Sequence, residues 1–188
     1  MSDPVKVLEF WLEKVGPAGW YQQSDALDAD VTEQFGALWQ TAHDGNLEHW
    51  VDGTTATLAY LIVTDQFPRN MFRNDPRAFA TDPQALTAAR LALEKNWDQG
   101  AAAPERQFFY MPFEHSEDPK DQALSVDCFT TRMDSAHNLL HARAHKKIIE
   151  RFGRFPFRNA ALDRTSTPEE KEFMAKGAYA SVVRSLQS

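Results

Sequence analysis

The sequence is poor in the features that mark several large protein classes. It has one cysteine, Cys128, among 188 residues, so no disulfide can form within the chain and we expect a reducing compartment, the cytoplasm. The longest strongly apolar run, residues 56–63, is far shorter than the roughly 20 residues that a membrane-spanning helix needs. No basic segment followed by an apolar run opens the chain, so we expect no signal peptide. These absences predict a cytoplasmic protein with no membrane partner.

Strand signals are also missing. No segment alternates apolar and polar residues for long, as a half-buried strand would. Helix-start signals recur instead. An Asp-Pro pair stands at residues 3–4, 82–83 and 118–119, where the aspartate can cap a helix and the proline fits its first turn. A capping box begins at Thr167 and ends at Glu170. The pattern predicts an all-α fold of about eight helices.

Helix ends are predicted from glycine, proline and new capping residues. We expect the first helix to end at Gly16 and the third to end at Pro68, and residues 68–82 to be a loop. The long helical pattern that follows residue 119 should break near Ser135, where a fresh cap is available. Residues 1–188 are predicted to form a single domain whose last few residues fray.

The composition limits the partners. Hydrophobic residues make up 43% of the chain, with 13 Phe and 5 Trp, which is enough for a large core and argues against disorder. The formal net charge of −7 disfavours nucleic acid and anionic membranes. The sequence has neither a Gly-rich phosphate loop nor a Cys/His zinc pattern, so we expect no cofactor.

Two stretches rich in arginine and phenylalanine stand out, residues 66–73 and 151–159. Both pair Phe-Pro with Arg-Asn at a helix exit. Residues 143–164 hold seven lysines and arginines against two acidic residues, a local positive excess in an acidic protein. Guanidinium groups bind carboxylate and phosphate through two parallel hydrogen bonds, so one hypothesis is an anion-binding site. The alternative is that the arginines pair with carboxylates of the chain itself and hold its loops. The carboxylates meant are Asp65, Asp75, Asp82, Glu114 and Glu117.

Histidines offer two further hypotheses. Residues 114–117 read Glu-His-Ser-Glu and could supply a general acid or base, or simply cap the helix that starts after them. His137, His141 and His145 lie four residues apart, on one stripe of a helix. Two histidines at this spacing can share a metal, but a catalytic zinc needs a third ligand that the pattern does not supply. We expect no metal there.

Four blocks of the sequence carry a resemblance to known proteins: residues 65–70, 76–82, 109–117 and 151–159. Together they resemble the DUF924 family of uncharacterised bacterial proteins. The resemblance implies a helical fold similar to tetratricopeptide proteins and brings no established activity. The family usually reads Phe-Pro-His-Arg-Asn where this chain has Phe157 in the middle, so no role of that histidine is implied here.

We predict that three segments, residues 65–77, 114–117 and 151–159, meet and form a pocket for a small anionic molecule such as phosphate or a carboxylate. The alternative is a tetratricopeptide-like module that binds a protein partner without catalysis. The sequence leaves open whether the protein is an enzyme. The predicted ligand-binding residues are Asp65, Arg69, Asn70, Arg73, Arg77, Glu114, His115, Glu117, His145, Arg151, Arg154, Arg158 and Asn159.

Overall fold

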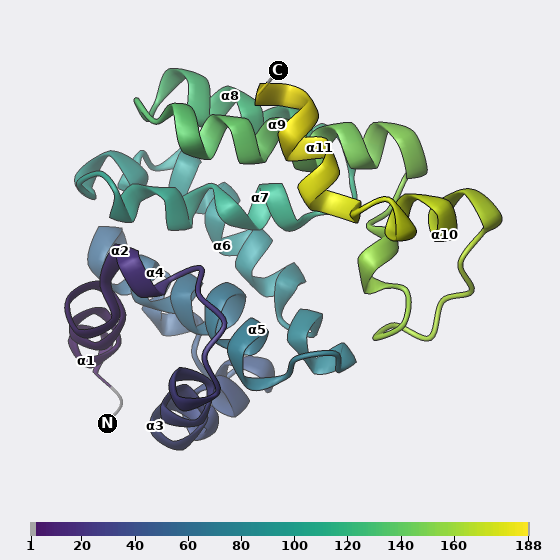
Figure 1. Cartoon of the computed structure of the whole chain (residues 1–188). Coiled ribbons are helices and arrows are strands. Elements are labelled where there is room, and N and C mark those ends of the chain that lie inside the picture. Colours follow the sequence, from purple (N-terminus) through teal and green to yellow (C-terminus); the bar gives the residue numbers. More distant parts are fainter. Residues whose placement is uncertain (1–2, 188) are drawn as a thin grey trace. The chain divides into compact units, whose positions relative to one another are not determined.

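The computed structural model describes residues 3–187, and every regular element in that range is helical (Figure 1). About three-quarters (75%) of the described residues are helical, with eight helices of seven or more residues among them, which confirms the all-α prediction. No helix in residues 3–187 is long and apolar enough to cross a membrane. The chain divides into two compact units, residues 1–112 and 113–188, so the single domain stays a prediction. Ser188, where the sequence predicts fraying to end, lies outside the described residues.

The first unit combines long and short α-helices with two π-helical segments and several short 3-10 helices. Its core is aromatic: the fully buried ring of Phe67 contacts Phe10, Trp11 and Phe35, with centroids 6.2, 5.5 and 4.8 Å away. The elements are α1 (Pro4–Leu8), η1 (Glu9–Val15), α2 (Gly16–Gly19), α3 (Asp25–His43), η2 (Glu48–Trp50), α4 (Gly53–Leu61), η3 (Ile62–Gln66), α5 (Phe67–Met71), η4 (Pro76–Phe79), α6 (Asp82–Glu94), η5 (Trp97–Gly100) and η6 (Glu105–Phe109).

The predicted helix end at Pro68 is wrong, because the helix continues through α5 to Met71. The five residues before Phe67 form a π-helical segment, η3, and the Phe67 N–H bonds to the Ile62 carbonyl. This wider turn accommodates a proline that would clash with the preceding turn of an ordinary α-helix, and Pro68 then lies in the first turn of α5. The predicted end at Gly16 is confirmed, since Gly16 caps η1 at φ +64°.

The second unit holds the predicted break and caps. Ser135 caps α9 by accepting a hydrogen bond from the Asn138 N–H, and Gly153 ends α9 in the left-handed conformation. The predicted capping box of Thr167 and Glu170 is present. The elements are α7 (Met111–His115), whose last three residues belong to this unit, α8 (Pro119–Thr131), α9 (Ala136–Phe152), η7 (Pro156–Arg158), α10 (Pro168–Ala175) and α11 (Ala178–Gln187).

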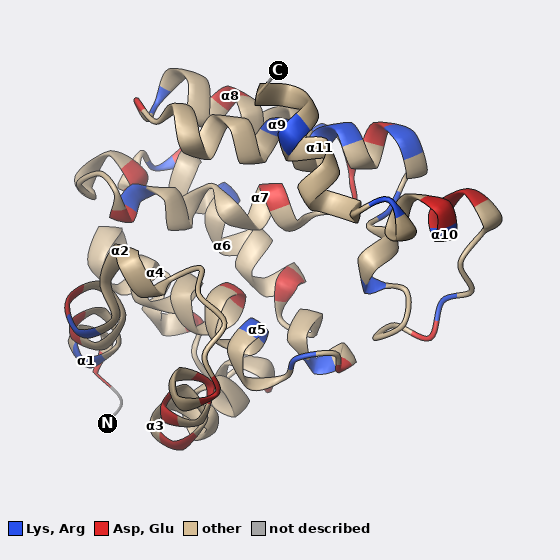
Figure 2. Ribbon diagram, in the orientation of Figure 1, with Lys and Arg blue, Asp and Glu red and all other residues tan. Residues whose placement is uncertain are grey.

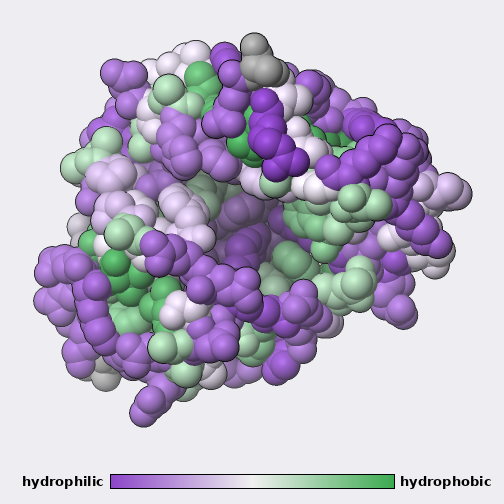
Figure 3. Space-filling view, viewed as in Figure 1, coloured by the Kyte–Doolittle hydropathy of each residue, from purple (hydrophilic) through white to green (hydrophobic). Residues whose placement is uncertain are grey.

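Helix α9 is the centre of the second unit, because α8 and α11 both pack against it. Its apolar side contributes Ile148 and Ile149 to a core cluster that Phe155 and Phe173 complete. Its other side is charged: Figure 2 shows Lys and Arg along the last turns of α9 and acidic residues on α10. The surface over α10 is accordingly hydrophilic in Figure 3. The loop after α9 therefore begins at a charged helix end, and Phe155 in this loop is buried in the apolar core.

Candidate functional site

The predicted residues of the first unit are engaged with carboxylates of the same unit. Arg69 forms a two-pronged ion pair with Asp82, with Nη1–Oδ1 and Nη2–Oδ2 distances of 3.0 and 3.2 Å. Its Nη2 also lies 3.4 Å from Oδ1 of Asp65, which is only 1% exposed. Its Nη1 donates to the Ala78 carbonyl at 3.0 Å. Arg69 thus joins the helix of Asp65 to the start of α6. Asp82, predicted as a cap, is instead the first residue of α6, and Thr81 holds the N-cap position.

Asp28 of α3 binds two more of the predicted residues, Arg73 and Asn70. Arg73 binds it through Nε and through Nη2, the latter at 2.8 Å from Oδ1, and Asn70 Nδ2 donates to Oδ1 at 2.8 Å. Burial would raise the pKa of Asp28, but the hydrogen bonds from Arg73 and Asn70 hold it below its ordinary value. Arg77 makes an exposed pair with Asp75. The internal pairing that the sequence offered as an alternative is therefore present throughout this group.

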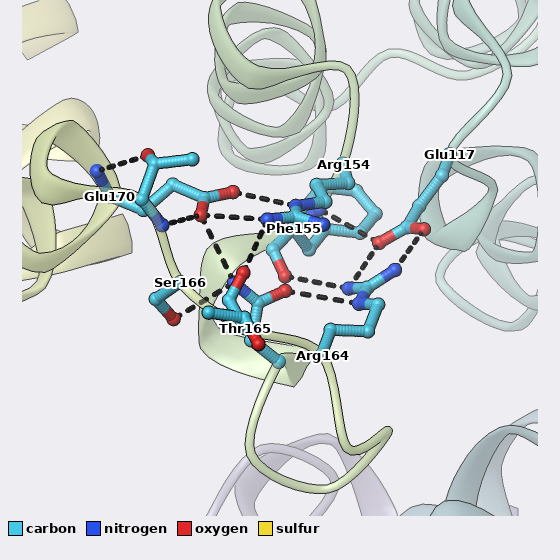
Figure 4. Close-up of polar contacts among 9 residues, drawn as sticks. Glu117, Arg154, Phe155, Arg164, Thr165, Ser166 and Glu170 are labelled. Atoms are coloured by element: carbon cyan, nitrogen blue, oxygen red, sulfur yellow. Dashed lines mark hydrogen bonds and ion pairs between the residues drawn. The ribbon is translucent and has the colours of Figure 1, made fainter.

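The second unit carries a buried carboxylate at the centre of a polar network (Figure 4). Glu170, 2% exposed, binds Arg154 through two parallel hydrogen bonds of 2.6 and 2.8 Å. Its Oε2 also accepts from the Thr167 N–H at 2.7 Å and from Asn159 Nδ2 at 3.3 Å. The hydrogen bond from Arg154, more than any other contact, lowers the pKa of Glu170 to about 2. This network fixes the loop between α9 and α10.

A second ion pair in this network joins the segment after α7 to the same loop. Arg164 binds Glu117 with Nη1–Oε2 and Nη2–Oε1 distances of 2.7 and 3.0 Å (Figure 4). The Phe155 N–H donates to Glu117 at 2.8 Å, and Arg164 donates to the Phe155 carbonyl at 3.1 Å and to Asn159 Oδ1 at 3.0 Å. Two of the three predicted segments, residues 114–117 and 151–159, thus lie together. Their meeting with residues 65–77 of the first unit stays a prediction.

Acid should remove the contribution of the Arg154–Glu170 pair to the stability of this unit, but only at a lower pH than protonates an ordinary carboxylate. Because the folded-state pKa of Glu170 is lowered from 4.5 to about 2, its contribution to stability is fully present above pH 4.5 and is lost as the pH falls towards 2. We expect Glu170→Gln to be less stable at pH 7 and to lose less further stability on acidification than the wild type. Urea unfolding at pH 7, 4 and 3 measures this difference.

The control for this prediction is Glu169→Gln. Glu169 makes a similar ion pair with Arg151, but both side chains are more than half exposed. Solvent screens such a pair, so its removal should leave the pH dependence of stability nearly unchanged. Equal changes for the Glu169 and Glu170 variants would contradict a structural role of the Arg154–Glu170 pair.

A group of histidines lies around the last two residues of α7. We call it the histidine cluster and define it as Glu114, His115, His141, His145 and Tyr179. Glu114 and His145 side chains are 7% and 15% exposed, and Glu114 Oε1 lies 2.7 Å from His145 Nδ1. The His115 ring is 6.2 Å from His145 by centroids, and Tyr179 is 4.7 Å from it. His141 is hydrogen-bonded to the Tyr179 hydroxyl. The Glu114–His145 pair and the imidazoles of His115 and His141 therefore lie close together.

The electrostatics of the cluster favour an ionised carboxylate. Burial would raise the pKa of Glu114, but the charge and hydrogen bond of His145, with smaller contributions from His115 and His141, bring it below its ordinary value. Burial lowers the pKa of His141, and the neighbouring His137 lowers it further. Within residues 3–187 no group of three or more His, Cys, Asp or Glu side chains could hold a metal ion.

Phenylalanine side chains connect the histidine cluster to the loop between α9 and α10. The Phe155 ring meets the edge of His145 at 5.4 Å, and the guanidinium of Arg158 lies over the same ring at 4.7 Å. Phe157, which stands where the resembling family usually has histidine, stacks on Phe155 at 5.2 Å and meets Tyr179 edge-on at 6.4 Å. The departure from the family pattern therefore lies beside the histidine cluster.

Sequence reasoning missed several partners of this site. In the sequence, Arg164 is counted among the basic residues of segment 143–164, and Glu170 is predicted as part of a capping box. Neither is predicted as an ion-pair partner, because no local pattern shows which carboxylate a distant arginine binds. Asp28 lies 45 residues from Arg73, and Tyr179 lies 38 residues from His141. No signal in the sequence points to either. Arg151, by contrast, forms its ion pair at the surface, with Glu169.

Comparison with known proteins identifies relatives without a known activity. Residues 7–178 match the model of a family described as a bacterial protein of unknown function, DUF924. A solved structure of a protein of unknown function from Agrobacterium tumefaciens is 37% identical and superimposes with a TM-score of 0.88. The similarity covers 93% of this chain and 97% of that one. No curated protein matches the sequence significantly.

Proposed function

We propose that this chain, which belongs to the DUF924 family of bacterial proteins of unknown function, binds a small anionic ligand, phosphate or a carboxylate, at the histidine cluster of the second unit. The observation that carries the proposal is the buried contact of 2.7 Å between Glu114 Oε1 and His145 Nδ1. A carboxylate that holds one nitrogen of an imidazole orients the ring and leaves the other nitrogen for a ligand.

The orientation of the His145 ring supports this role. Its Nδ1 also lies 3.0 Å from the His141 carbonyl, which can only accept, so Nδ1 carries a hydrogen and donates. The second nitrogen, Nε2, is the one that can meet a ligand. In the doubly protonated form of the ring both nitrogens donate, so Nε2 can donate a short, strong hydrogen bond to a phosphate or carboxylate oxygen. His115 would supply a further donor.

The arginines enter this proposal in two ways. We infer that Arg69, Arg73 and Arg154 hold the two units in shape, since each is ion-paired to a carboxylate of its own unit. Arg77 and Arg151 form exposed pairs, which contribute little to stability. Asp65, Asn70, Glu117 and Asn159 belong to the same internal networks. Arg158 is placed to act on a ligand together with His145, because its guanidinium and the His145 ring both contact the Phe155 ring.

Thermal denaturation in the presence of anions tests the proposal. A ligand at about 100 times its Kd adds about 2.7 kcal/mol of stability, which raises the Tm of a chain of this size by roughly 5–10 °C. We expect phosphate or a small dicarboxylate, titrated at constant ionic strength, to produce such a shift in the wild type. His145→Gln should abolish it, because glutamine carries no charge and has no ring nitrogen at the position of Nε2.

The control is His137→Gln, on the same helix and outside the cluster contact with Glu114. This variant should respond to the ligand as the wild type does. A wild-type protein that no small anion stabilises would overturn the proposal. The tetratricopeptide-like alternative would then be favoured if a protein partner binds with a fixed stoichiometry. The cytoplasm remains our proposed compartment, on the single cysteine alone.

A further inference from the structure

A groove between α9 and α11 in the second unit has a composition that the histidine cluster does not explain. Its volume is about 290 Å³, close to the lower end of the range for small-molecule sites, about 300–1,000 Å³. None of its lining residues belongs to the histidine cluster. We call it the α9–α11 groove, and it is lined by Lys147, Ile148, Arg151, Phe152, Phe173, Ser181, Val182 and Ser185.

The floor of the groove is apolar. Ile148 and Phe173 belong to the buried core cluster, and Phe152 and Val182 are partly buried against it. Helix α11 has no fully buried residue, so it covers α9 incompletely and leaves these apolar side chains within reach of the groove. An apolar group placed here would be removed from water on one side by aromatic rings and on the other by Val182.

The rim of the groove is positive. Lys147 is exposed and makes no hydrogen bond or ion pair with any residue that the structure describes. Arg151 binds Glu169, but both side chains are more than half exposed, and such a pair contributes little and can be exchanged. Ser181 and Ser185 donate to the carbonyls of Ala178 and Val182, so their oxygens can only accept. The two cations are therefore what an anionic group would bind.

We propose that the α9–α11 groove binds a short-chain aliphatic monocarboxylate. Its carboxylate lies between Lys147 and Arg151, and its chain lies on Phe152, Phe173 and Val182. A single negative charge suits this rim, where one cation has no partner among the described residues and the other has an exposed, exchangeable one. The site stands independently of the histidine cluster, since it uses other residues and another chemistry.

Calorimetric titration with butyrate, pentanoate and hexanoate tests the apolar part of the site. Burial of each added methylene is expected to tighten binding by about fourfold until the groove is full. Ser185→Phe, which places a ring at the mouth of the groove, should remove this dependence on chain length. Hexanol, which has the tail without the charge, should bind about tenfold or more weakly than hexanoate. Affinity that does not change with chain length would overturn the proposal.

Charge reversal tests the head group. Lys147→Glu should weaken hexanoate binding by about tenfold or more, and His145→Gln should leave it unchanged. Lys146→Glu is the matched control, because the neighbouring lysine reaches Glu150 instead and does not line the groove. Equal losses in the two lysine variants would show attraction to the general charge of α9. A loss on His145→Gln alone would place the carboxylate in the histidine cluster. Either result would overturn the proposal that the α9–α11 groove binds the carboxylate.

Discussion

Replacement of Arg69 by alanine is expected to lower the free energy of unfolding of the first unit by about 3–5 kcal/mol. The side chain holds Asp82 through two hydrogen bonds and lies 3.4 Å from Asp65, whose carboxylate is almost completely buried. Without the guanidinium, Asp65 keeps a hydrogen bond from Gln66 but loses the positive charge of Arg69 beside it. Urea unfolding followed by tryptophan fluorescence reports on this unit, because all five tryptophans lie in residues 11–97.

Arg77→Ala is the matched control for Arg69→Ala. Arg77 lies eight residues further along, and its pair with Asp75 is exposed to solvent, with the arginine side chain 59% accessible. Its removal should shift the urea midpoint little. If both variants lost stability equally, the buried carboxylate could not be the cause. If Arg69→Ala instead unfolded like the wild type and lost a response to phosphate, the residue would serve a ligand, as the sequence first suggested.

The helices could be predicted because their signals are local. A cap side chain, a proline in the first turn or a glycine after the last turn acts within four residues, so the break at Ser135 and the end at Gly153 follow from neighbouring residues. Pro68 misled the prediction because its effect depends on the turn before it. The π-helical segment Ile62–Gln66 has no distinctive composition, and it changes what a proline six residues after its start does to the helix.

The site could be predicted only in part, for a different reason. Arginines near buried aromatic residues must have anionic partners, and this requirement is visible in the sequence. Which carboxylate each arginine meets depends on the packing of helices far apart in the chain: Asp28 for Arg73, Glu170 for Arg154 and Glu117 for Arg164. The contact between Glu114 and His145 is of the same kind. The sequence named both residues but could not pair them.

Replacement of Phe155 by alanine is expected to destabilise the second unit by about 3–5 kcal/mol. The ring is fully buried and completes the core cluster of Ile148, Ile149 and Phe173, so its loss leaves a cavity next to α9. The hydrogen bonds of the Phe155 backbone with Glu117 and Arg164 do not depend on the side chain. The change therefore isolates packing from the ion-pair network. Amide hydrogen exchange in α9, followed by mass spectrometry, should become roughly a hundred- to several-thousand-fold faster.

Phe157→Ala separates this burial from the mere presence of an aromatic ring in the loop. Phe157 stacks on Phe155 but is 36% exposed, so its truncation removes a ring contact and opens no enclosed cavity. We expect the exchange of α9 amides to change several-fold at most, since an aromatic pair adds about 0.5–1.5 kcal/mol beyond burial. Equal acceleration in the two variants would mean that the stacked pair, and not the buried ring, supports α9. The exposed contact between Phe157 and Phe155 would then support the histidine cluster, and Phe157→Ala should also remove the stabilisation of the protein by anions.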